Sequence, residues 1–119
     1  MKRIALFVLI ISLTSLAHGQ TPTLTQCKTT ADMLMAVTSD SQFSHLTASM
    51  TAGDELELST KLAQCQDAYA KQLTPKQFDK TDRMMYKLDA DVINRMYGFM
   101  ERHHLTDKFN DEEEARRKK

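Results

Sequence analysis

The chain has 119 residues, of which 16 are basic and 16 are acidic, so its formal net charge at pH 7 is zero. This balance excludes an electrostatic argument for binding nucleic acid or an anionic membrane surface. The chain contains three glycines, two prolines and no tryptophan, and it has no run of the β-branched residues that favour strands. The composition therefore favours one small all-helical domain.

The first 19 residues are typical of a secretory signal peptide. Lys2 and Arg3 precede an apolar run over residues 4–16, and small residues follow at Ala17 and Gly19. That run is too short to span a bilayer comfortably. Cleavage after Gly19 is expected, with cleavage after Ala17 as the alternative. Removing the two basic residues leaves 14 against 16 acidic ones, a net charge of −2.

The first part of the mature chain is expected to hold one helix followed by a loop. Thr21 and Pro22 suit a helix start, as a cap followed by a proline. Apolar and small residues then recur at helical spacing, namely Leu24, Cys27, Ala31, Leu34 and Thr38. Residues 39–49 are rich in Ser, Thr, Asp and Gln, which predicts a loop, with a short helical turn inside it as an option.

A second helix is predicted to begin at Thr51, with Asp54 at the third position of its cap. Glu55 and Glu57 add negative charge at the positive end of the helix dipole. Its apolar stripe consists of Leu58, Leu62, Cys65, Tyr69 and Leu73. Only Thr74 and Pro75 separate it from the next helix, so we expect antiparallel neighbours, with a single rod kinked at Pro75 as the alternative.

The longest predicted element is an amphipathic helix over residues 73–105. Thr74 is its N-cap, Pro75 occupies the first helical position, and Gln77 completes a capping box. Its apolar stripe is Phe78, Met85, Leu88, Val92, Met96, Phe99 and His103, flanked by Tyr86, Ile93, Tyr97 and Met100. A stripe this broad needs partners, so the rest of the chain is expected to cover this helix. The acids Asp82, Asp89 and Asp91 are interpreted as a solvated face.

After this helix the sequence becomes highly charged. Four acidic residues at 111–114 are followed by four basic residues at 116–119, with opposite charges four residues apart. This order suits a short solvated helix. A frayed charged tail is the equal alternative.

Cys27 and Cys65 are the only cysteines, and each lies on the apolar stripe of its predicted helix. In an exported chain an even number of cysteines favours a disulfide. Closing a loop of about forty residues stabilises a protein by roughly 4 kcal/mol on the chain-entropy model. Neither cysteine has the Cys-x-x-Cys setting of a redox-active pair.

The residues that could support chemistry are few. His103 and His104 are adjacent, so they point about 100° apart on a helix and do not easily share a metal. Met33 or Met35 together with His103 follows the layout of four-helix b-type cytochromes, in which a Met and a His from the terminal helices bind the haem iron. The alternative is that these methionines fill the core, which is the more common role of methionine at helical spacing. No hydrolase, phosphate-loop or dinucleotide motif occurs. We therefore expect no enzyme, no cofactor, and no catalytic or metal-binding residue.

Leu73-Thr74-Pro75-Lys76-Gln77 resembles the Leu-Thr-x-x-Gln motif of small periplasmic stress-response chaperones and metal-resistance proteins. Those proteins usually carry the motif twice, and residues 50–54 are a degenerate second copy. The resemblance implies an exported, all-helical, dimeric protein with a concave surface for unfolded clients. The two cysteines and the segment Arg102-His103-His104-Leu105 also resemble uncharacterised small exported bacterial helical proteins, and that resemblance implies no activity.

Together these patterns predict a signal peptide at residues 1–19, a helical domain at 20–105 and a charged tail or short helix at 106–119. The fold is expected to be an antiparallel bundle of three main helices, with a short fourth as an option, joined by Cys27–Cys65. The predicted function is a non-enzymatic binding protein of the periplasm or exterior that recognises a protein or peptide. A chaperone-like dimer is the main alternative, and a haem or metal carrier is the lesser one.

Overall fold

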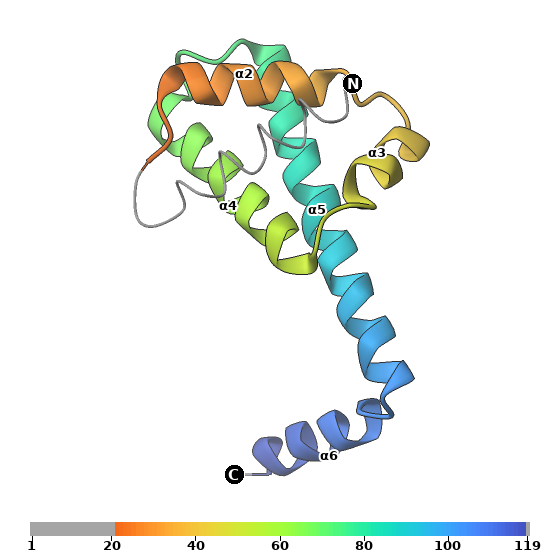
Figure 1. Ribbon diagram of the computed structural model, residues 1–119. Coiled ribbons are helices and arrows are strands. Elements are labelled where there is room, and N and C mark those ends of the chain that lie inside the picture. Colours follow the sequence, from red (N-terminus) through yellow and green to blue (C-terminus); the bar gives the residue numbers. More distant parts are fainter. Residues whose placement is uncertain (1–20, 119) are drawn as a thin grey trace.

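The computed structural model describes residues 21–118, and within that range it contains five helices and no strand. The predicted signal peptide at residues 1–19 lies outside the described residues. Figure 1 shows α2 lying across α4 and α5, with α3 beside α5 and α6 at the far end. The helices are α2 Leu24–Met35, α3 Asp40–Thr47, α4 Ala52–Tyr69, α5 Pro75–Arg102 and α6 Thr106–Arg117. The protein is therefore all-helical, although it has more helices than the three main ones predicted.

Four of these helices begin with the same reciprocal cap, in which a Thr or Ser bonds to the third helical residue and receives a bond in return. The predicted caps at Thr51 and Thr74 are confirmed. The predicted start at Thr21 is wrong, because Thr23 caps α2. The N–H of Thr23 donates to Oε1 of Gln26 at 2.9 Å. A capping box needs Gln or Glu three residues after the cap, and Gln26 has that separation from Thr23 but not from Thr21.

The predicted loop at residues 39–49 is also wrong, since α3 occupies most of it. Ser39 accepts from the N–H of Gln42, and the Gln42 side chain accepts from the N–H of Ser39 at 3.1 Å. This capping box starts the helix despite its polar composition. Leu46 and Met50 then bury their side chains in the core.

The core lies where α2, α3 and α4 meet the first half of α5. α4 and α5 run in opposite directions, as predicted, and the five residues between them form a turn (Figure 1). On α5 the buried row includes the polar side chains of Gln77 and Thr81, which the apolar pattern did not include. Gln77 Nε2 donates to Asp32 Oδ1 at 2.9 Å, and Thr81 Oγ1 accepts from Gln66 at 3.0 Å. The apolar core residues are Leu34, Val37, Leu46, Met50, Leu58, Leu62, Met84 and Leu88.

The predicted disulfide is present. Cys27 on α2 and Cys65 on α4 are joined, with their Cα atoms 5.7 Å apart. Both side chains are buried. The bond therefore attaches the first helix to the central pair through the interior of the bundle.

α5 extends well past the bundle, and α6 leaves its end in a new direction (Figure 1). The change of direction is a Schellman turn, in which His104 adopts a φ of 55° and the N–H of Leu105 donates to the carbonyl of Met100 at 2.8 Å. The charged segment is thus helical over residues 106–117. Within residues 21–118, no helix is long and apolar enough to cross a membrane.

Candidate interaction surface

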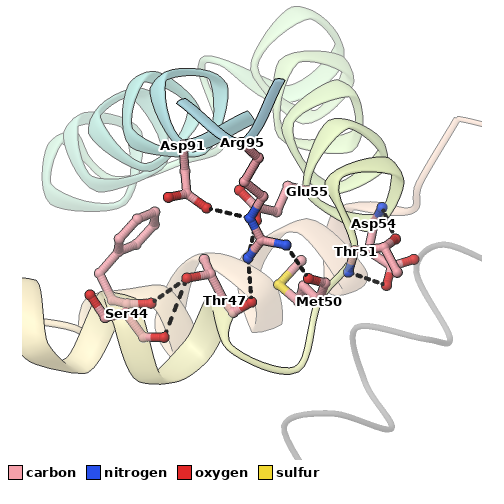
Figure 2. Close-up of polar contacts among 9 residues, drawn as sticks. Ser44, Thr47, Met50, Thr51, Asp54, Glu55, Asp91 and Arg95 are labelled. Carbon is pink, nitrogen blue, oxygen red and sulfur yellow. Dashed lines mark hydrogen bonds and ion pairs between the residues drawn. The ribbon is translucent and has the colours of Figure 1, made fainter. Parts of the chain in front are cut away.

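Figure 2 shows Arg95 of α5 among Asp91, Glu55, Thr47 and Met50. The Nε of Arg95 pairs with Oδ2 of Asp91 at 3.0 Å, one turn earlier on α5. Its Nη1 donates to the carbonyl of Met50 at 2.7 Å and its Nη2 to the carbonyl of Thr47 at 2.8 Å. Nη2 also lies 2.8 Å from Oε1 of Glu55, on the first turn of α4. One guanidinium therefore joins α5, α4 and the turn that connects α3 to α4, a set that we call the Arg95 junction.

Glu55 is the unusual member of this junction, because its side chain is fully buried. Its contact with Arg95 is the pairing of Oε1 with Nη2 at 2.8 Å. Burial, the largest cause, and the neighbouring carboxyl of Asp91 together raise the pKa of Glu55 from 4.5 to about 7, while the positive charge of Arg95 opposes the rise. Near neutral pH this carboxyl therefore gains and loses a proton inside the fold.

The interpretation of Asp91 as part of a solvated face is wrong, because Asp91 lies half-buried in this junction. Asp89 is also engaged, accepting from Ser59 of α4 at 2.8 Å. Glu55 was not predicted to be buried, although its position in the sequence indicates it. Glu55 precedes Leu58 by three residues and therefore lies on the same apolar stripe of α4 as Leu58 and Leu62.

Large apolar side chains are exposed where α5 projects and on α6. Of the eight exposed large hydrophobic residues among those described, six lie at or after residue 93. The prediction that the chain covers the whole of the long helix is therefore wrong for its last third. We call these six the distal surface: Ile93, Met96, Tyr97, Phe99, Leu105 and Phe109.

The two apolar faces of α5 are separate. The buried row ends at Leu88 and Val92, whereas Ile93 and Tyr97 lie about 140° away around the helix at 3.6 residues per turn. The residues thought to flank one stripe thus form a second one on the outer side. Tyr86 is the most exposed of the large hydrophobic residues at positions 21–118, at 81 %, and it extends this outer stripe toward the first turns of α5.

The other candidate residues do not form a site. His103 is exposed and lies against Phe99, with ring centroids 4.2 Å apart. Met33 and Met35 belong to α2, at the opposite end of α5 from His103 (Figure 1), so the cytochrome-like pairing of these residues is wrong. Among residues 21–118, no three His, Cys, Asp or Glu side chains gather closely enough to hold a metal ion.

Comparison with known proteins adds no relative, since no family model, curated protein or solved structure matches this chain. The Leu-Thr-x-x-Gln segment has a local role in this fold, because Thr74 and Gln77 form the reciprocal cap of α5. The Arg95 junction supports a helix whose outer side is apolar and exposed.

Proposed function

We propose that this is an exported, non-enzymatic binding protein of the cell envelope, and that it recognises a protein partner through the distal surface. The observation that carries the proposal is the concentration of exposed apolar side chains on one projecting part of the molecule. Large apolar side chains that are exposed together on one part of a small domain mark a site of interaction. Tyr, Phe and Met are also enriched in the centres of protein interfaces.

The location is supported by two independent features. The first 19 residues have the charge and apolar pattern of a signal peptide. The buried Cys27–Cys65 disulfide is of the kind that persists in oxidising compartments. A periplasmic or extracellular site of action accounts for both.

The Arg95 junction supports the proposal by giving the projecting helix a fixed starting direction. Arg95, which contacts the carbonyls of Thr47 and Met50, directly precedes Met96 and Tyr97 of the distal surface in the chain. A binding surface held in place loses less conformational entropy when a partner docks. The junction therefore serves recognition.

Site-specific photo-crosslinking in living cells tests the proposal. A photoreactive phenylalanine analogue at Tyr97 is compared with the same analogue at Glu57, which is exposed on α4 and lies outside the distal surface. Discrete crosslinked products are expected at position 97 and not at position 57. Equal labelling at both positions, or none at 97, would reject the distal surface as an interface.

The chaperone-like alternative gives a different pattern in the same experiment. A surface that holds many unfolded clients yields a continuous smear of products at position 97, because clients differ in mass. A dedicated binding protein yields one or two bands. If the wild-type protein slows the aggregation of a denatured enzyme and Tyr97→Glu does not, that result would favour the chaperone-like alternative.

A further inference from the structure

We propose that the occupant of the outer stripe of α5 is a second copy of this chain, packed antiparallel along the helix. This inference rests on the proposed function and names the partner of the part of the distal surface that contains Ile93 and Tyr97. The stripe has the spacing of a helix–helix seam. Tyr86, Ala90, Ile93, Tyr97 and Met100 follow one another at alternating steps of four and three residues, which is the 3.5-residue repeat of coiled-coil packing.

The charged residues beside this seam are placed so that those of one copy can pair with those of a second copy. Lys87 and Glu101 lie on the same flank, each one residue after a seam residue. When two copies of α5 run antiparallel with Ile93 of one beside Tyr97 of the other, Lys87 of one copy faces Glu101 of the second. The two-fold axis repeats the pair, as an isologous interface requires.

The antiparallel direction also suits the shape of the molecule. The bundle surrounds only the first part of α5, and the last part projects from it (Figure 1). Antiparallel packing places the two bundles toward opposite ends of the seam. Parallel packing would place them side by side, where they would compete for the same space.

The exposed area suits a weak, reversible dimer. The large exposed side chains of the seam, Tyr86, Ile93 and Tyr97, are 81 %, 51 % and 64 % exposed. Complete burial of these fractions would cover roughly 500 Å² per copy, or roughly 1,000 Å² for the pair, which is the size of weak or transient interfaces. The area therefore favours a reversible dimer over an obligate one.

A charge-exchange cycle measured by analytical ultracentrifugation of the mature, disulfide-bonded protein tests this inference. We expect a reversible monomer–dimer equilibrium in the wild type. Lys87→Glu and Glu101→Lys should each weaken dimerisation about tenfold. Each substitution places two like charges opposite each other across the interface, and the two-fold axis repeats that pair. The double variant should return to within about threefold of the wild type. Asp40→Asn is the control, since Lys87 also pairs with Asp40 at 3.1 Å within one copy.

Ile93→Glu provides a second test, because Ile93 is half-exposed and its loss should leave the fold intact, as circular dichroism would verify. We expect this variant to be monomeric. A wild type that stays monomeric at every concentration, a dimer that persists in Ile93→Glu, or a double variant without rescue would overturn the inference. Monomeric protein that still crosslinks from position 97 to a different protein would reject self-association and leave the proposed function standing.

Discussion

The buried carboxyl of Glu55 makes the stability of this fold depend on pH in a direction opposite to that of most acids. The pKa of Glu55 is 4.5 in the unfolded chain and about 7 in the folded protein. Between these values the folded protein holds a proton that the unfolded chain has released. Stability is therefore fully present below pH 4.5 and is lost as the pH rises through 7.

The size of this effect follows from the shift in pKa. A shift of roughly 2.5 units corresponds to about 3 kcal/mol, since each unit is worth about 1.4 kcal/mol. The total free energy of unfolding of a small domain is about 5–15 kcal/mol. Glu55→Gln replaces the carboxyl by a neutral group of the same shape. We expect this variant to match the wild type near pH 4.5 and to be more stable by about 2–3 kcal/mol at pH 8.

Urea unfolding followed by circular dichroism between pH 4.5 and 8 measures this difference. Glu57→Gln is the matched control, because Glu57 is an exposed acid on the same helix. The wild type should lose stability relative to Glu55→Gln as the pH rises, whereas Glu57→Gln should follow the wild type. If the wild type and Glu55→Gln have parallel pH profiles, the reasoning about burial is refuted.

Three other outcomes are expected. Asp91→Asn should lower the pKa of Glu55, because the neighbouring carboxyl of Asp91 raises it; carboxyl titration by NMR would show this, and an unchanged midpoint would argue against an influence of Asp91 on Glu55. Replacing Cys27 and Cys65 together by Ser should lower the free energy of unfolding by about 4 kcal/mol for a separation of 38 residues, as measured in urea, and a loss under 1 kcal/mol would contradict the loop-closure argument. Thr74→Ala should cost about 1 kcal/mol through loss of the α5 cap, and no change in the urea midpoint would count against that role.

The features that the sequence predicted correctly depend on few residues. The cap of α5 needs only Thr74 and Gln77, which are three residues apart, so local chemistry decides it. The disulfide could be predicted because the chain has only two cysteines and both lie on apolar stripes. The same local reasoning could have found α3, since Ser39 and Gln42 form an equivalent box, but the polar composition suggested a loop.

The features that the sequence did not predict depend on distant contacts. Arg95 meets the carbonyls of Met50 and Thr47, which lie 45 and 48 residues earlier in the chain. No local pattern predicts that a turn will fold back to these positions. Likewise, periodicity identifies Ile93 and Tyr97 as apolar residues on a helix, but it does not tell where the bundle ends. Exposure of the distal surface follows from the position of that end.

Oxidation footprinting of methionine in intact cells tests most directly whether a partner covers the distal surface. Met96 is 57 % exposed in the isolated chain, whereas Met84 is 1 % exposed and serves as the internal standard. Met96 is expected to be protected in the wild type and to oxidise rapidly in Ile93→Glu, while Met84 stays protected in both. Rapid oxidation of Met96 at the same rate in both proteins would mean that nothing covers the distal surface in the cell, and would contradict the account.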